Sequence, residues 1–207
     1  MKNYEMMGLF PTPLYFTRLE REFTPQEVSF VELESEDLDN NNGNMIGKGI
    51  EVLNEPPLHQ LREFIQSHIE QYFHDICAPS SDVKIHLTQS WLNYTYPGQN
   101  HHIHMHDNSF LSGVLYINAN KEEDAIMFTS GRGHAIRLTT DNYNIFNSEI
   151  WKVPVHSGDL LIFPSRLVHQ VEATSTDRSI TRVSLAFNTF IRGEIGDKRN
   201  RIHLVLK

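Results

Sequence analysis

Short segments in which apolar and polar residues alternate fill the chain after Pro79, and this pattern constrains the fold most. The segments expected to form strands are residues 83–96, 109–118, 125–129, 150–155, 159–163, 167–173, 180–191 and 202–206. Gly, Pro, Asn, Asp or Ser bounds each of them, and no helical segments alternate with them. The pattern therefore predicts an all-β core built as a sandwich or barrel.

One long helix is expected before these strands, over residues 57–75. Pro56 and Pro57 stand at its start, and apolar residues then recur at three- and four-residue spacing. Such a helix has one apolar face, which we expect to pack on the outside of a sheet. Residues 6–19 alternate weakly and predict an opening strand. Residues 34–49 are acidic and then rich in Asn and Gly, which predicts a flexible loop.

Length and composition limit the classes of protein. The 207 residues indicate one domain, with an N-terminal strand, acidic loop and helix over residues 1–80 and the strand core over 81–207. A net charge of -8 argues against duplex nucleic acid or an anionic membrane as the partner. Cys77 is the only cysteine, so a reducing compartment, the cytoplasm, is expected. The sequence leaves open whether the chain forms a homodimer.

Four of the twelve histidines lie between His101 and His106, in the sequence HHIHMH. If the segment is extended, side chains alternate, so His102, His104 and His106 share one face and His101 lies on the other. Two histidines spaced in this way lie roughly 7 Å apart at Cα, which suits two ligands of one metal ion. Imidazole binds iron, zinc, copper and nickel. A solvated polar loop is the alternative.

A fifth histidine, His169, follows a turn at Gly158, an apolar strand and a second turn at Pro164. This order is typical of the return of a jelly roll, in which strands distant in the sequence lie side by side at the barrel mouth. That arrangement would bring His169 to His104 and His106. A surface histidine beside a strand is the alternative.

Arg182 begins an apolar strand, and we expect it to face inward with every second residue as far as Asn188. A buried guanidinium needs an anionic partner, and it matches a carboxylate bidentately. The candidate site therefore offers a metal and, one strand away, a clamp for a carboxylate. In the alternative, Arg182 faces solvent and pairs with Asp177 or Glu172.

Six motifs in a fixed order carry a resemblance to a known family. They are Leu9-Phe10-Pro11-Thr12-Pro13-Leu14, Trp91-x-Asn93, His104-x-His106, Ser112-Gly113-Val114-x-Tyr116, Gly158–Ser165 with His169, and Arg182-Val183-Ser184-Leu185-x-Phe187-Asn188. Together they resemble the Fe(II)/2-oxoglutarate-dependent dioxygenase superfamily. More narrowly, they resemble a group of 2-oxoglutarate–Fe(II) oxygenases found in phages and marine bacteria.

The resemblance implies a double-stranded β-helix (jelly roll) with one long flanking helix and minor helices. It implies Fe(II) and 2-oxoglutarate as cofactors. The implied metal ligands are His104, His106 and His169, and the implied cosubstrate contacts are Arg182, which would hold the far carboxylate of 2-oxoglutarate, Asn93 and Tyr116. The implied reaction hydroxylates an unidentified organic or peptidyl substrate and decarboxylates 2-oxoglutarate to succinate.

The chain departs from the superfamily pattern at the second metal ligand, where Asp or Glu is usual and His106 stands here. The nearest carboxylate is Asp107, which would reach the metal only if the chain turns inward after His106. A site of three histidines carries one more positive charge than the usual site, and this alters its affinity for iron.

Two other classes remain open at this stage. A cupin-like metal-binding protein or isomerase shares the jelly roll and the paired histidines, but Phe110 and Leu111 occupy the positions of its glutamate, and Arg182 has no role in it. A noncatalytic jelly-roll structural module would bind no metal. Residues 130–134 are expected to form a loop over the mouth of the site, with Arg132 or Arg137 as candidate substrate contacts.

Overall fold

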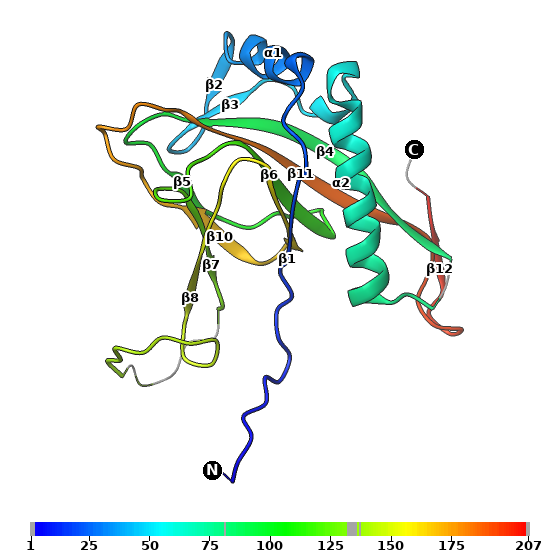
Figure 1. Ribbon diagram of the computed structural model, residues 1–207. Helices are drawn as coiled ribbons and strands as arrows, with labels where there is room; N and C mark the ends of the chain where they lie inside the picture. The colour runs from blue at the N-terminus through cyan, green and yellow to red at the C-terminus, as the bar shows by residue number, and fades with distance from the viewer. Residues whose placement is uncertain (1–2, 81, 132–135, 137, 206–207) are drawn as a thin grey trace.

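The computed structural model describes residues 3–80, 82–131, 136 and 138–205 (Figure 1). Its strands are β1 (Tyr15–Arg18), β2 (Leu38–Asn40), β3 (Met45–Gly47), β4 (Val83–Thr95), β5 (His101–His104), β6 (Leu111–Asn118), β7 (Ala125–Thr129), β8 (Ile150–Pro154), β9 (Asp159–Pro164), β10 (Val168–Val171), β11 (Arg182–Ile195) and β12 (Ile202–Leu204). The all-β core that the alternation predicts is confirmed, because each expected strand is present with its ends shifted by a few residues.

The strands form two sheets. The larger has the order β1-β9-β6-β11-β4-β3-β2, with β12 paired to β11, and the smaller has the order β5-β10-β7-β8. All the ladders within the sheets are antiparallel, and strands far apart in the sequence pair, such as β10 with β5 and β11 with β4. This pairing between distant strands is the one that the jelly-roll interpretation requires.

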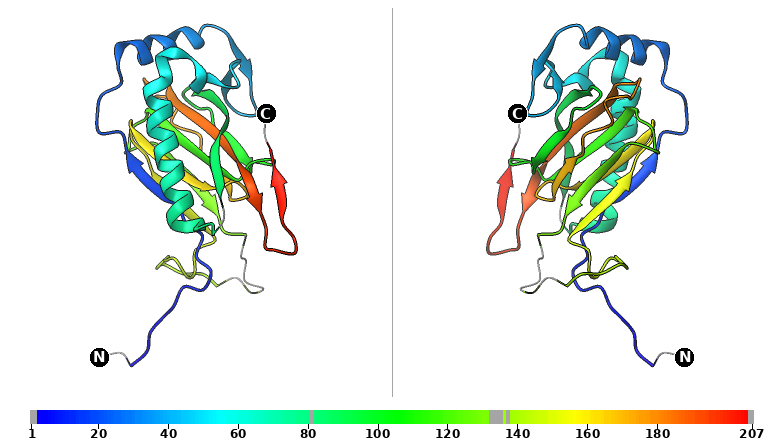
Figure 2. Two further views of the ribbon diagram at one scale, coloured as in Figure 1. Left: turned by 90° about the vertical axis from the view of Figure 1, so that its right-hand side faces the viewer. Right: turned by 90° about the vertical axis from the view of Figure 1, so that its left-hand side faces the viewer.

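The long helix expected over residues 57–75 is confirmed. It comprises a 3-10 turn η2 (Pro56–Leu58), the α-helix α2 (His59–Tyr72) and a final π-helical turn η3 (Phe73–Cys77). It packs along the outer face of the larger sheet (Figure 2), where Leu61, Ile65 and Ile69 are completely buried. Burying each of these side chains stabilises the fold by about 2 kcal/mol.

The prediction of a flexible loop over residues 34–49 is wrong, because this segment forms a hairpin of β2 and β3. β3 pairs with β4, which supplies backbone hydrogen bonds that a local sequence pattern does not reveal. A helix, α1 (Pro25–Glu34), precedes the hairpin, and a short turn, η1 (Val52–Asn54), follows it. Thr24 starts α1 with a capping box: its side chain accepts the Glu27 N–H, and the Glu27 carboxylate accepts the Thr24 N–H.

Two apolar clusters lie on the two faces of the larger sheet. Leu185 and Phe187 of β11 pack on the outer face with α2, and Val114 and Phe163 pack between the sheets. The alternation expected from Arg182 onward is therefore confirmed, since its apolar residues face α2 and Arg182 faces the space between the sheets. This division leaves the inner face of β11 available for polar side chains.

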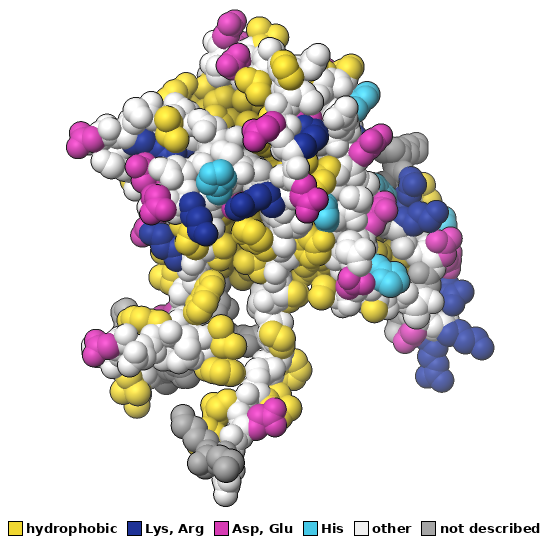
Figure 3. Space-filling model, viewed as in Figure 1, with side chains coloured by type: hydrophobic (Ala, Val, Ile, Leu, Met, Phe, Trp, Pro, Cys, Tyr) yellow, Lys and Arg dark blue, Asp and Glu magenta, His cyan; other side chains and the backbone are white. Residues whose placement is uncertain are grey.

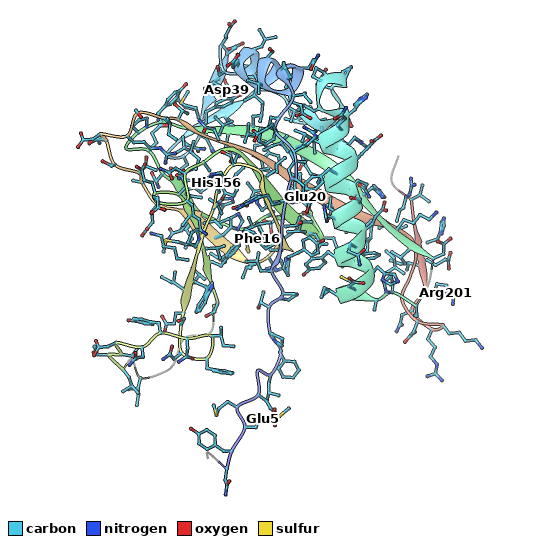
Figure 4. All side chains as sticks on the ribbon, viewed as in Figure 1. Glu5, Phe16, Glu20, Asp39, His156 and Arg201 are labelled. Atoms are coloured by element: carbon cyan, nitrogen blue, oxygen red, sulfur yellow. The ribbon has the colours of Figure 1, made fainter. Side chains whose placement is uncertain are left out.

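The expected opening strand over residues 6–19 forms only over β1. Pro11 and Pro13 lack the backbone N–H that a sheet ladder needs, and the chain before β1 extends away from the sheets, with Glu5 near its outer end (Figure 4). Hydrophobic side chains gather on this segment and on the long β7–β8 connection (Figure 3). In the described part of the chain, no helix has the length and apolar character needed to cross a membrane.

Gly113 of β6 lies where two neighbouring strands approach closely, so we expect Gly113→Ala to destabilise the fold. A Cβ there would lie 2.6 Å from the carbonyl oxygen of Leu161 and would overlap the ring of Phe187. Overpacking of this kind lowers the free energy of unfolding by about 1–3 kcal/mol, measurable by urea denaturation. Gly8→Ala is the control, because the nearest atom would be 4.0 Å away. Equal stabilities of the two variants would contradict the prediction.

Candidate active site

Three histidines from two separate stretches of chain meet at one end of the smaller sheet. His169 on β10 pairs with His104 on β5, and the His106 backbone N–H donates to the carbonyl oxygen of Ser165, just before β10 (2.9 Å). The ligand nitrogens of the three imidazoles all lie within 4.8 Å of one another. The ring centroids are 4.3 Å apart for His104 and His169 and 5.0 Å apart for His104 and His106. One metal ion fits between rings so arranged.

Hydrogen bonds fix the protonation of two of these rings. The His104 Nδ1–H donates to the carbonyl oxygen of His102, and the His169 Nδ1–H donates to that of Leu167, each over 2.8 Å. A carbonyl oxygen only accepts, so Nδ1 carries the proton and Nε2 keeps a free lone pair. Metal-bound histidines are commonly oriented by such a bond to the second ring nitrogen.

Burial keeps all three rings neutral. It lowers the pKa of His106 to about 4 and that of His169 to about 3, and the nearby His104 adds repulsion in both cases. Burial also lowers the pKa of His104. A neutral imidazole is the form that binds a metal, so no proton has to leave these rings at neutral pH.

Asp107 is exposed and does not belong to this group of ligands among the described residues. β5 ends at His104, and the chain beyond it directs His106 toward His169. In space it is therefore the imidazole of His106, rather than the carboxylate of Asp107, that joins His104 and His169.

The prediction that His101 and His104 lie on opposite faces of the strand is wrong. The two rings stack with centroids 4.6 Å apart, because the pairing of β5 with β10 contains an irregularity. His104 pairs with His169 and His101 pairs with Val171, so three steps along β5 match two steps along β10. A bulge of this type brings an extra residue onto the inner face, which strict alternation does not predict.

Arg182 is 3% exposed and faces the space between the sheets, as expected. Its Nη1–H donates to Asp124 Oδ1 over 3.0 Å, so the alternative pairing with Asp177 or Glu172 is wrong. Within the described part of the chain, its buried Nη2 has no hydrogen-bond partner. A buried donor left unpaired by the protein costs free energy, which a bound anion would recover.

Asp124 and Arg178 support this guanidinium, and the sequence analysis missed both. Arg178 donates to both carboxylate oxygens of Asp124, at 2.6 and 2.7 Å, and both side chains are buried. The single negative charge of Asp124 is thus shared by two guanidiniums, so part of the positive charge of Arg182 is not neutralised. Asp124 lies at the end of the turn before β7, where an acidic residue is ordinary, so no local pattern marks it.

A cavity of about 230 Å³ connects these groups. Its walls include all six residues named for the site from the sequence: Asn93, His104, His106, Tyr116, His169 and Arg182. Asn93 is buried, and its Oδ1 has no partner among the described residues. Burial raises the pKa of Tyr116, so its hydroxyl keeps its proton. Residues Arg132, His134 and Arg137 lie outside the described residues.

Residues 89–188 match a family model described as "Putative 2OG-Fe(II) oxygenase". This segment is similar to the 2OG-Fe(II) oxygenase family. The superfamily resemblance is thereby confirmed over almost half of the chain, and with it the predicted enzyme class and the cofactors Fe(II) and 2-oxoglutarate. The match favours this class over the cupin-like and structural alternatives. The narrower likeness to phage and marine bacterial proteins stays a prediction.

Solved structures of 2OG-Fe(II) oxygenases share the fold. A prolyl-4-hydroxylase from Pseudomonas putida is 16% identical with a TM-score of 0.54, over 86% of this chain and 92% of that one. HygX from Streptomyces hygroscopicus, with nickel, 2-oxoglutarate and hygromycin B bound, is 13% identical with a TM-score of 0.59, over 86% and 82%. At these identities the likeness confirms the double-stranded β-helix alone. No curated protein matches the sequence.

The buried charges of Asp124 and its two arginines predict a pH-dependent stability. Burial alone would raise the pKa of Asp124, but the hydrogen bonds from Arg178 and the charges of both arginines lower it below its ordinary value. Breaking such a pair with Asp124→Asn costs about 3 kcal/mol at pH 7. Because the pKa is lowered in the folded state, this stabilisation is complete above the unfolded-state pKa and is lost as the pH falls below it.

Urea denaturation of the wild type and of Asp124→Asn at several pH values measures this effect. We expect a constant gap in unfolding free energy down to about pH 4 and a narrowing gap below it. A gap that stays the same at pH 3 would contradict the assignment of the charge to Asp124.

Proposed function

We propose that this protein is an Fe(II)- and 2-oxoglutarate-dependent hydroxylase in which His104, His106 and His169 hold the iron and Arg182 holds the far carboxylate of 2-oxoglutarate. One observation carries the proposal: three neutral imidazoles line the same cavity as a buried guanidinium whose Nη2 has no partner among the residues that the structure describes. A purely structural role would not require the imidazoles and the guanidinium to lie in one buried cavity.

The imidazoles fit a divalent iron. Nitrogen ligands suit Fe(II), and three protein ligands leave coordination positions for a cosubstrate and for oxygen. When bound, iron and 2-oxoglutarate supply the oxidation of a C–H bond, coupled to release of succinate and carbon dioxide. The protein's part is to hold the ligands in place and to keep water out, and the rings of Phe163 and Phe128 beside His169 serve the second purpose.

The polar end of the cavity fits a carboxylate. Arg182 would donate to the ligand from Nη2, and Asp124 holds the guanidinium in one orientation through Nη1. The Tyr116 hydroxyl, which keeps its proton, is a second donor for the same anion, and the Asn93 amide is a third polar group beside it. These donors and the three imidazoles line the same cavity, so they would hold the two ends of a dicarboxylate such as 2-oxoglutarate and its metal together.

The rest of the cavity wall is where the substrate would bind. Trp91, Ile46 and Asn41 line it, and Trp91 packs against His106 with ring centroids 5.8 Å apart. These three side chains, two apolar and one amide, suit an organic or peptidyl side chain of small size. Ile46 and Asn41 belong to the β2–β3 hairpin, so this hairpin would contribute to the choice of substrate.

Arg182→Ala should weaken the binding of 2-oxoglutarate by at least ~30-fold, because it removes a buried charge partner of the ligand. The affinity of Arg182→Lys for 2-oxoglutarate should fall between those of the wild type and Arg182→Ala, since an ammonium keeps the charge but lacks the planar guanidinium. Calorimetry with Ni²⁺ in place of Fe²⁺ measures binding, and succinate formation with Fe²⁺ measures turnover. Arg166→Ala, at an exposed arginine, is the control. Absence of succinate together with unchanged affinity in Arg182→Ala would reject the proposed function.

The identity of the second metal ligand has its own test. His106→Ala should weaken Co²⁺ binding by at least ~10-fold, because it removes one of three nitrogen ligands. Asp107→Ala should leave the affinity unchanged, since this carboxylate is exposed and lies outside the ligand group. His106→Asp recreates the usual two-histidine, one-carboxylate set and should retain the metal. A loss of affinity in Asp107→Ala would show that the assignment of the second ligand is wrong.

A further inference from the structure

A second group of three histidines lies beside the first. The ligand nitrogens of His101, His102 and His104 also lie within 4.8 Å of one another. Their ring centroids are 5.2 Å apart for His101 and His102, 4.6 Å for His101 and His104, and 4.8 Å for His102 and His104. These spacings match those of the inner group, His104, His106 and His169, which range from 4.3 to 5.1 Å. Either group can surround one ion.

The fold holds this second group in position. The bulge between β5 and β10 turns His101 onto the inner face, and the His102 Nδ1–H donates to the carbonyl oxygen of Asn42 over 3.0 Å. That hydrogen bond leaves Nε2 of His102 with a free lone pair. The Asn100 N–H donates to the carbonyl oxygen of Gly43, so the β2–β3 hairpin is tied to the histidine segment at two points.

We propose that His101, His102 and His104 form an outer binding site for a divalent transition-metal cation, from which the ion passes to the inner group through His104. The proposal rests on the metal-binding role proposed above for the inner group. Three imidazoles without a carboxylate select iron, cobalt, nickel or zinc over magnesium and calcium, which prefer oxygen ligands.

Because both sites need His104, an ion can occupy only one of them at a time. Its Nδ1 carries the proton donated to the His102 carbonyl oxygen, so only Nε2 can bind an ion. The wild-type chain therefore holds a single ion in this cluster. During transfer the ion keeps its bond to His104 and exchanges the other two imidazoles.

Burial sets the direction of transfer. His169 is 5% exposed and lies against the rings of Phe163 and Phe128, whereas His102 is only half-buried and its bond to Asn42 lies at the surface. An ion arriving from solvent meets the outer site first. The inner site contains the buried His169 ring, packed against two aromatic rings that exclude water, so it binds the ion more tightly and the ion ends there.

The equilibrium test removes the inner site. In His106→Leu/His169→Leu, a Co²⁺ titration followed by absorbance should still show a single bound ion, more weakly held than in the wild type. Adding His101→Ala and His102→Ala should lower this residual affinity by at least ~10-fold. Adding His74→Ala and His203→Ala instead should leave it unchanged, because these exposed histidines lie outside both groups. Equal residual affinities in the two combined variants would overturn the proposal.

The kinetic test keeps the inner site and does not depend on the folding of the leucine variant. His101→Ala/His102→Ala should slow Co²⁺ uptake by the metal-free protein at least ~10-fold and change the final affinity far less. An uptake rate equal to that of the wild type would overturn the proposal. Neither test uses 2-oxoglutarate or turnover, so a protein that forms no succinate can still pass both. Conversely, the proposed function survives if only the outer site fails.

Discussion

The antiparallel pairing of β5 with β10 is the contact on which the site depends. It places His104 opposite His169 although they are far apart in the sequence, and the same edge holds His106 through its backbone bond to Ser165. Hydrogen bonds between serine side chains support the turn at Ser165: the buried Ser112 donates to Ser165 over 2.9 Å, and Ser165 donates to the half-buried Ser109 over 2.8 Å. A slip of one residue in this register would turn His169 away from the other two rings. Register, rather than any single residue, therefore creates the candidate metal site.

Much of this arrangement could be predicted from the sequence, because a two-residue period decides which side of a strand a residue occupies. The inward position of Arg182 and the apolar face toward α2 both follow from that period on β11. The order of motifs then indicated which distant strands meet. The roles of the predicted ligands and cosubstrate contacts stay predictions, since the sequence and the fold determine only where these side chains lie.

The features that the sequence did not reveal all depend on tertiary pairing. The bulge that moves His101 exists only because β5 is matched against β10, and the β2–β3 hairpin exists because β3 adds to the edge of β4. Asp124 becomes meaningful only when the fold brings to it Arg182 at the start of β11 and Arg178 in the turn before β11. Local composition describes each of these segments correctly as polar, but it contains no information on the partner strand.

In the proposed site, charge would connect the metal and the cosubstrate. Because His104, His106 and His169 are all neutral, they leave the full double charge on a bound divalent cation, whereas a carboxylate ligand would offset part of it. Arg182 adds further positive charge, since it shares Asp124 with Arg178. The dianion 2-oxoglutarate balances both charges at once in a site of low polarity, where electrostatic interactions are strong. A site with three histidines should therefore depend more on its anionic cosubstrate to retain the metal than a site with a carboxylate ligand does.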